Sequence, residues 1–220
     1  MSRRRALMAR VQSEPQAEYI QNGLLYQFVS DDSDGQTWVD RINGLTFTLA
    51  NVSKAQDKGL YFDGSAVGVL PDVSLPENYT VEIVYNKTGT GSDYYSLMYS
   101  HKNQMIAIVI SESKFRADLD GRNREYQYSY ENSRKATASI TNASLIILNE
   151  TVLTTYVGAG TFYAFYSGIQ IGARANANGS FQNYGLVGEL YQIRVYDRQL
   201  SEAEILFNQA IDIAKYHIQV

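Results

Sequence analysis

Tyrosine is the residue type whose number and spacing most clearly suggest chemistry in this chain. There are 18 tyrosines among 220 residues, against 8 phenylalanines and one tryptophan. A tyrosine ring can stack on the C–H face of a sugar while its hydroxyl hydrogen bonds, at a low cost in side-chain entropy. The same ring also favours half-buried strand positions. The excess therefore fits either a recognition surface or ordinary packing.

Three groups of tyrosines are the candidate ligand-binding residues. Over residues 125–130, tyrosines alternate with polar residues, so they would project from one face of a strand. The candidate contacts are Tyr126, Tyr128 and Tyr130 with Arg122 and Arg124 beside them, Tyr94, Tyr95 and Tyr99 in a second group, and Tyr166 in a third. Each group could instead face the opposite sheet and belong to the core.

Aspartates in two turns are the candidate calcium ligands. Calcium takes about six to eight oxygen ligands, mainly carboxylates and loop carbonyls. The best local supply is Asp31, Asp32 and Asp34, and Asp63 is a further candidate. The alternative is a plain polar turn, since aspartate and glycine are common turn residues. Calcium is thus possible, and no other cofactor is indicated.

Acid–base catalysis lacks a recognisable set of residues. A retaining glycosidase needs two carboxyl groups about 5–5.5 Å apart, and no run of acids alternates suitably along a strand. Asp118 and Asp120 do alternate, but they lead into Gly121, which indicates a hairpin turn. The two histidines are His101 and His217, and no G-x-S-x-G elbow occurs. We expect a protein that is not an enzyme.

Composition and charge exclude several classes of protein. There is no cysteine, the net charge is −4, and no apolar run approaches the about 18 residues of a membrane span. The acidic balance argues against nucleic acid as a partner. Arginines gather in the first ten positions, at Arg3, Arg4, Arg5 and Arg10. They do not resemble a secretory signal, because no apolar segment follows them. Residues 1–18 are predicted to be a basic arm or linker that docks on a partner, or else a solvated tail.

Short strands would have to position these residues. From residue 19 onward, two-residue alternation is interrupted by turn residues every eight to twelve positions, which is typical of an antiparallel β-sandwich. The predicted strands are 24–29, 45–49, 60–62, 79–85, 94–99, 105–111, 114–119, 125–130, 136–140, 145–148, 151–156, 169–171 and 188–196. One domain over residues 19–220 accounts for them.

One helix is predicted over residues 201–215. Ser201 and Glu204 have the spacing of a capping box, and Leu200 and Ile205 that of a hydrophobic staple. Leu206, Ala210 and Ile213 recur at helical spacing and are expected to dock on the sandwich.

Three sequence segments resemble a known family. The segment 185–205, with its Tyr196-Asp197-Arg198 turn before Leu200-Ser201, resembles the closing motif of laminin-G-like domains in the concanavalin A-like lectin/glucanase superfamily. The segments 59–65 and 169–174 are similar to that family's phenylalanine–aspartate–glycine turn and late isoleucine–glycine strand. The resemblance implies an all-β antiparallel jelly-roll β-sandwich. The beginning of the chain is also similar to laminin-G-like proteins of gut-bacterial phages and prophages.

The leading hypothesis is therefore a non-enzymatic carbohydrate-binding or adhesion module. The phage resemblance implies a virion protein of the tail, fibre or capsid decoration, or a bacterial cell-surface protein, that binds host or bacterial surface glycan. We expect a homo-oligomer attached to other assembly proteins through its N-terminal arm. The alternatives are a purely architectural virion or surface protein with no sugar ligand and, third, a glycan hydrolase or lyase.

Overall fold

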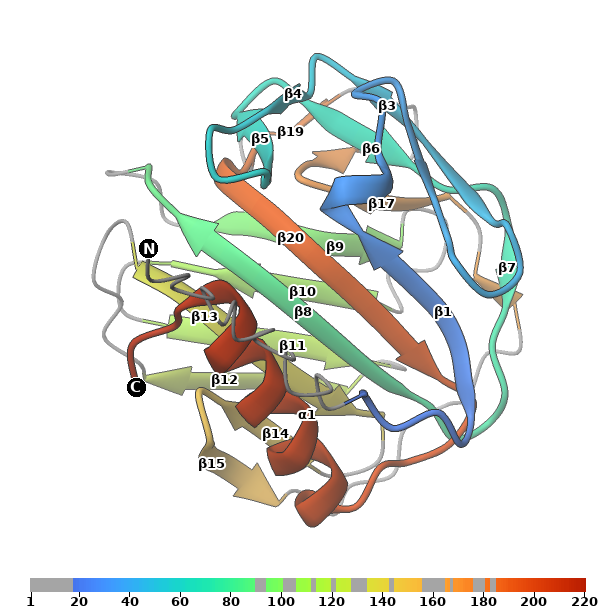
Figure 1. Cartoon of the computed structure of the whole chain (residues 1–220), viewed down its shortest axis with the longest axis vertical. Helices are drawn as coiled ribbons and strands as arrows, with labels where there is room; N and C mark the ends of the chain where they lie inside the picture. The colour runs from blue at the N-terminus through green and yellow to red at the C-terminus, as the bar shows by residue number, and fades with distance from the viewer. Residues whose placement is uncertain are drawn as a thin grey trace, which may run out of the picture.

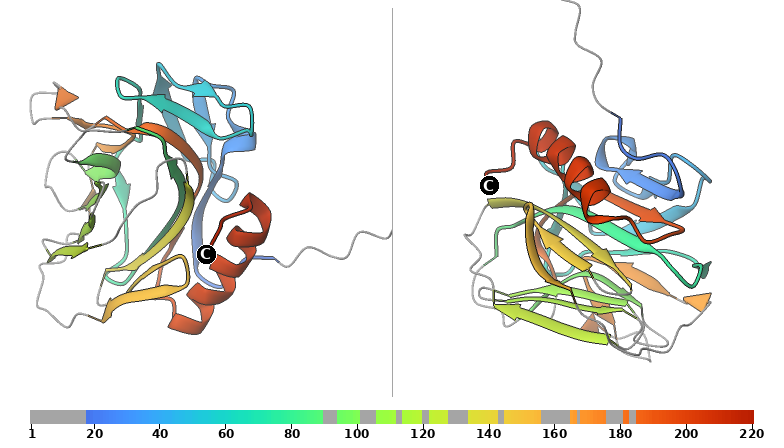
Figure 2. Two further views of the ribbon diagram at one scale, coloured as in Figure 1. Left: turned by 90° about the vertical axis from the view of Figure 1, so that its left-hand side faces the viewer. Right: turned by 90° about the horizontal axis from the view of Figure 1, so that it is seen from below.

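The computed structural model describes residues 18–89, 94–100, 106–111, 114–119, 122–127, 134–142, 145–155, 165–166, 168–175, 181–182 and 185–220. They form two antiparallel sheets that pack face to face, with one helix outside, as Figures 1 and 2 show. This is the predicted jelly-roll β-sandwich with a short C-terminal helix.

Sheet A contains eight strands among the described residues. In spatial order they are β15 (Thr151–Thr155), β14 (Leu145–Leu148), β13 (Arg134–Thr141), β8 (Thr80–Lys87), β20 (Val187–Tyr196), β5 (Leu60–Asp63) and β4 (Ser53–Lys54), and β1 (Leu24–Val29) also pairs with β20. The central pair, β8 and β20, crosses the middle of Figure 1.

Sheet B also contains eight strands among the described residues. Their order is β12 (Arg122–Gln127), β11 (Lys114–Leu119), β10 (Ile106–Ile110), β9 (Tyr95–Ser100), β17 (Ile169–Ile171), β6 (Val67–Val69), β3 (Thr46–Ala50) and β2 (Thr37–Val39). The remaining described elements are the ribbons β7 (Val73–Ser74) with β16 (Phe165–Tyr166) and β18 (Arg174–Ala175) with β19 (Phe181–Gln182), and the 3-10 turn η1 (Ser30–Asp32).

The core lies between the sheets, where alternate residues of each strand point inward. On β8, Val81, Ile83 and Tyr85 belong to the main hydrophobic cluster. Thr80, Glu82, Val84 and Asn86 therefore lie on the outer face of sheet A. The predicted alternation of this strand is confirmed, although every residue of β8 is buried. A polar outer face that is buried needs an explanation.

The covering element is the helix α1 (Glu202–Tyr216), which lies on the outer face of sheet A in Figure 2. The predicted capping box is present: the Ser201 hydroxyl accepts from the Glu204 amide, and the Glu204 side chain accepts from the Ser201 amide. Leu200 and Ile205 are both buried in one cluster, as the predicted staple requires. The chain turns left-handed at His217, where the helix ends.

The predicted docking face of the helix is confirmed for Leu206 and Ile213, which pack against buried clusters on the sheet, and is wrong for Ala210. Ala210 is exposed, whereas Leu206 and Ile213 are half-buried at the margins. The buried residues of the helix are Ile205, Asn208, Gln209 and Asp212. Three of the four are polar, because the sheet beneath them is polar as well.

Several strand ends differ from their predictions. The prediction 125–130 is shifted, since β12 begins at Arg122. Leu119 pairs with Arg122, so two residues connect β11 and β12. This register agrees with the predicted hairpin at Asp120-Gly121, whose own placement lies outside the described residues. Most strands of two or three residues, such as β2 and β6, were not predicted because so short a segment shows little alternation; β17, predicted as 169–171, is an exception.

Candidate functional site

The predicted tyrosine sites are described only in part. Tyr126 lies in β12 with Arg122 and Arg124, and Tyr166 lies in β16, but their side chains are outside the described part of the structure. Tyr128, Tyr130 and the arm residues Arg3, Arg4, Arg5 and Arg10 also lie outside the described residues. The assignments of ligand and partner contacts to these residues stay predictions.

The second tyrosine group divides in two. Tyr95 is only 2% exposed and belongs to the main core cluster, so its expected exposure to a ligand is wrong and the core alternative holds. Tyr99 is also buried, at 4% exposed, so its expected exposure to a ligand is wrong as well. It pairs with Gln170 and Ala107, in a row that continues through Val69 to exposed Thr48. This row lies on the outer face of sheet B. Tyr94 is half-buried before β9.

The calcium candidates form turns rather than a shared cation site. Asp34 accepts from the backbone amides of Gln36 (2.8 Å) and Thr37 (2.6 Å). Asp63 accepts from the amides of Ser65 (2.8 Å) and Ala66 (3.0 Å). The Ser65 hydroxyl also donates to Asp63 (2.8 Å) and, ahead of the amides, lowers its pKa; the amide hydrogen bonds from Thr37 and Gln36 lower that of Asp34.

The other two aspartates are engaged by basic side chains. Asp32 pairs with Arg41, and Asp31 lies 3.8 Å from the ammonium of Lys58. Within the described part of the chain, no three acidic or histidine side chains gather as metal ligands. The polar-turn alternative therefore describes these residues.

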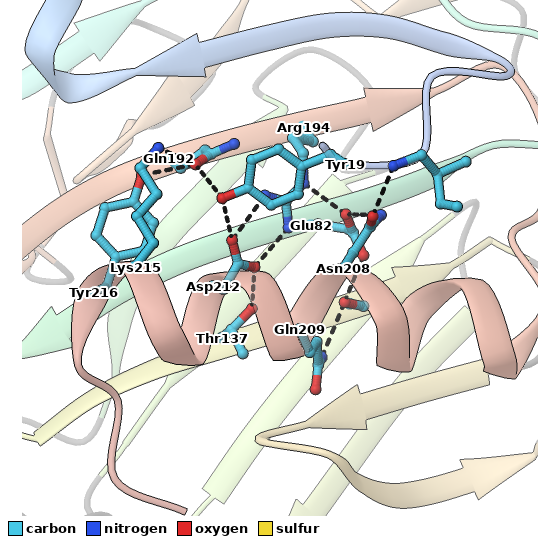
Figure 3. A network of polar contacts seen from close by, with 12 residues as sticks. Tyr19, Glu82, Thr137, Gln192, Arg194, Asn208, Gln209, Asp212, Lys215 and Tyr216 are labelled. Carbon is cyan, nitrogen blue, oxygen red and sulfur yellow. Dashed lines mark hydrogen bonds and ion pairs between the residues drawn. The ribbon is translucent and has the colours of Figure 1, made fainter. Parts of the chain in front are cut away.

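A network of buried charges joins the helix to sheet A (Figure 3). Arg194 on β20 donates to Glu82 on β8 (2.7 Å) and to both carboxylate oxygens of Asp212 on α1 (2.8 and 2.6 Å). All three side chains have no exposed surface. Burial and the negative charge of Asp212 raise the pKa of Glu82, although Arg194 opposes this. Such buried ions require complete pairing.

Neutral groups supply the rest of the pairing. Asn208 donates to Glu82 (3.0 Å), and Gln209 donates to Ser139 on β13 (2.9 Å). The hydroxyls of Tyr19 and Thr137 both donate to Asp212 at 2.9 Å. The network is closed to solvent and its charged oxygens have donors, so its role is to fix the helix and the Tyr19 segment on the sheet.

The same outer face opens beyond the C-terminal end of α1. Here five residues from five strands lie in register across sheet A: Ser53, Tyr61, Glu189, Asn86 and Lys135. We call them the Glu189 row. The pairing of β20 with β8 shifts between Leu190 and Gln192, a β-bulge that lies directly beside the row. Bulges often occur next to binding sites, because they redirect side chains.

Asp57, from the loop between β4 and β5, lies over the row. Its carboxylate accepts from the Tyr191 hydroxyl at 2.7 Å and pairs with the Lys135 ammonium at 2.8 Å. The same ammonium lies 4.7 Å from the centre of the Tyr191 ring. Gly59 permits this approach, since a Cβ there would come within 2.8 Å of the Tyr191 ring and 2.9 Å of Glu189.

The rim of this site is accessible while its floor is buried. The side chains of Asp57 and Lys135 are 44% and 23% exposed. Tyr61 and Glu189 are half-buried, and Asn86 and Tyr191 are buried. Solvent therefore reaches the rim of the row at Asp57 and Lys135, while Oδ1 of Asn86 and Oε2 of Glu189 lie covered beneath it.

Two buried oxygens in the row have no hydrogen-bond donor: Oδ1 of Asn86 and Oε2 of Glu189. The Asn86 amide group already donates toward Glu189 and Tyr191. Burial and the charge of Asp57 raise the pKa of Glu189. Asp57 behaves oppositely: although burial opposes the effect, hydrogen bonds from Lys135 and Tyr191 lower its pKa. Unpaired buried acceptors are rare in folded proteins and call for a specific partner.

Sequence reasoning did not find this site. The sequence predicted the strand that contains Glu189 and Tyr191 and the strand that contains Tyr61. It also predicted a strand that begins at Ala136, one residue after Lys135. The approach of these residues depends on contacts between segments far apart in the sequence, up to the 134 residues that separate Asp57 from Tyr191. The available signal was a glutamate at an outward position of the predicted strand 188–196, which also contains Gln192 and Arg194.

No protein-family model matches this chain, and no curated protein matches it significantly. Solved structures do resemble it. Trypanosoma rangeli sialidase, in complex with 2,3-difluoro-KDN, has a TM-score of 0.68 at 13% identity, over 88% of this chain and 33% of the sialidase. The chain thus spans about a third of that enzyme's length.

Two smaller proteins are similar as well. Domain 4 of AbnA, a GH43 extracellular arabinanase from Geobacillus stearothermophilus, was solved with arabinotriose; it gives a TM-score of 0.66 at 11% identity, over 84% of this chain and 98% of that domain. The botulinum neurotoxin serotype D/C binding domain gives 0.62 at 14% identity, over 88% and 53%.

At these identities the likeness shows the fold alone, a β-sandwich consistent with the predicted concanavalin A-like class. The laminin-G-like and phage relationships stay predictions. Among the described residues, the helix is too short and too polar to cross a membrane.

Proposed function

We propose that this chain is a non-enzymatic carbohydrate-binding module that holds a glycan at the Glu189 row. The observation that carries the proposal is a row with a solvent-accessible rim, in which Asn86 and Glu189 hold buried oxygens without donors beside half-buried Tyr61. Sugar hydroxyls supply hydrogen-bond donors, and aromatic rings contact the C–H faces of sugars.

The fold comparisons support the same ligand class. The neighbours include a sialidase solved with a sialic acid analogue and an arabinanase domain solved with arabinotriose. The arabinanase domain is informative, because 98% of it is covered by this chain. It is a similar unit in size, and its structure was determined with a sugar.

The setting that we propose is a phage particle or a bacterial cell surface. The support is the sequence resemblance to laminin-G-like proteins of phages and prophages, together with the arginine-rich first ten residues. The arm would attach the module to its assembly, and several copies would raise the avidity for surface glycan. The tyrosines of residues 126–130 would then be a second contact area.

The test is binding of the full chain to an array of neutral, acidic and amino glycans. Glu189→Gln and Tyr61→Ala should reduce the signal for the bound glycans at least tenfold, because they remove the acceptor and the ring. Glu77→Gln is the matched control, since Glu77 is exposed before the other end of β8. Tyr126→Ala tests the second area.

Three results would contradict the proposal. Absence of binding to every glycan would favour an architectural role without a sugar ligand. Binding that is unchanged in Glu189→Gln and Tyr61→Ala, but lost in Tyr126→Ala, would place the sugar on sheet B instead. Release of reducing sugar by the wild-type chain would show an enzyme.

A further inference from the structure

The Glu189 row has more acceptors than donors and a negative balance of charge. Two carboxylates, Asp57 and Glu189, face one ammonium group, that of Lys135. Lys135 is held by Asp57 at 2.8 Å, and its contact with the Tyr191 ring fixes it there. The negative charge of Glu189 is therefore not neutralised by an ion pair among the described residues.

The unpaired oxygens lie buried at the floor of the site rather than on exposed surface side chains. Asn86 is nine-tenths buried, with 9% of its surface exposed. Hydrogen bonding from its side chain contributes to lowering the pKa values of Glu189 and Tyr191, against the larger effect of burial, and its Oδ1 has no donor. Oε2 of Glu189, the cross-strand neighbour, is buried and unpaired as well.

The unpaired oxygens indicate which chemical group of a ligand would fit this row. An anionic ligand would be repelled by the surplus carboxylate. A calcium ion needs about six to eight oxygens, and the described residues provide no set of three acidic ligands. A hydroxyl donates one hydrogen bond and leaves the charge in place. A primary ammonium donates three hydrogen bonds and carries one positive charge.

We infer that the Glu189 row binds the protonated amine of an amino sugar, with Glu189 and Asn86 as acceptors and Tyr61 against the ring. This inference rests on the proposed carbohydrate-binding function and deepens it. The exposed Asp57 carboxylate adds a third acceptor at the rim. With the amine bound, the two carboxylates and two ammonium groups balance.

Three trisaccharides with one backbone test the inference. The chitosan trisaccharide, the N-acetylated chitin trisaccharide and cellotriose differ at the 2-position of each sugar, which carries an ammonium, an acetamide or a hydroxyl. Isothermal titration of the full chain should give a Kd for the chitosan trisaccharide about tenfold lower than for cellotriose, as a charged hydrogen bond implies. The N-acetylated sugar should bind no better than cellotriose.

Variants separate specific contact from general attraction to an acidic protein. Glu189→Gln should abolish the preference for the amine, while Glu77→Gln, which removes the same charge elsewhere, should retain it. Asn86→Leu removes the second acceptor and should reduce the preference severalfold. A thermal melt of each variant shows whether it folds.

The possible failures are distinguishable. Equal affinity for the three sugars would overturn the amine inference while leaving sugar binding intact. Absence of binding to all three, with no binding on the glycan array, would overturn both. If the Glu189→Gln variant still preferred the amine, the amine would bind at a site other than the Glu189 row. Equally tight binding of lysine amide would show an ammonium site for protein rather than for sugar.

Discussion

The outer face of sheet A has two halves built on the same strands, and they differ in how completely their carboxylates are paired, although Nε2 of Gln192 beside the helix is also buried and unpaired. Under α1, Glu82 and Arg194 meet Asp212, and their side chains have no exposed surface. Beyond the helix, Asn86 and Glu189 stand on the same two strands with buried oxygens unpaired. The Tyr191–Tyr216 ring contact, with centroids 5.5 Å apart, marks the boundary.

The difference shows that polarity on one sheet face can serve two purposes. Buried charges are tolerated only with complete pairing, which the helix brings as a polar face of its own. Where the helix ends, the pairing ends as well. The acceptors left over have to be satisfied from outside the described residues, and this makes the open half the candidate for ligand binding.

The largest expected effect is on the closed half. Arg194→Met leaves Glu82 and Asp212 buried without their shared cation, so the free energy of unfolding should fall by about 3–5 kcal/mol. Urea denaturation measures it. A loss below about 1 kcal/mol would show that the helix is not held by this network.

Glu204 links the helix to the turn before it and should give stability that depends on pH. Hydrogen bonds from Arg198 and from the Ser201 amide lower its pKa from 4.5 to about 2. A carboxyl with a lowered pKa stabilises the fold above its unfolded value, so this contribution is present above about pH 4.5 and is lost as the pH falls toward 2.

Glu204→Gln should therefore cost about 1–2 kcal/mol at neutral pH and little at pH 2. Denaturant curves at several pH values measure both. A constant cost across this range would mean that the ionised carboxylate is not what stabilises the helix start.

Removing a cation from the open half should cost far less than removing one from the closed half. Lys135→Met leaves Asp57, which is 44% exposed, to water. Partly exposed ion pairs contribute at most about 1 kcal/mol. A loss as large as that of Arg194→Met would show that the two halves do not differ in kind.

The smallest expected effect on stability is that of Glu189→Gln. It removes a half-buried carboxylate whose pKa is raised, so unfolding free energy should change by less than about 0.5 kcal/mol. A thermal melt beside the binding experiment measures it. A marked destabilisation would assign Glu189 a structural role and weaken the case for a ligand.

The sequence indicated the sandwich because its strands alternate and its helix carries a complete cap. The bounds of β1, β11, β14 and β17 agree with their predictions. Ala210 was misplaced because an apolar helix face was assumed, whereas a polar sheet selected Asn208 and Asp212. No local sequence pattern indicates that the sheet face beneath the helix is polar.

The candidate site could not be predicted for a related reason. Its members come from five strands, and only the pairing register brings Tyr61, Glu189 and Asn86 together. The tyrosine count pointed toward sugar recognition but not toward these residues. Tyr95, chosen for its type, is part of the core because a large ring on an inward position fills the space between the sheets.

The central claim is that a sugar binds to the open half of the face. Titration of the ¹⁵N-labelled full chain with the chitosan trisaccharide, followed by amide chemical shifts, tests it most directly. We predict the largest shifts at residues 57–61, 86, 135 and 189–191. Shifts confined to the outer face of sheet B around Tyr99 and Gln170, or no saturable shifts, would contradict it.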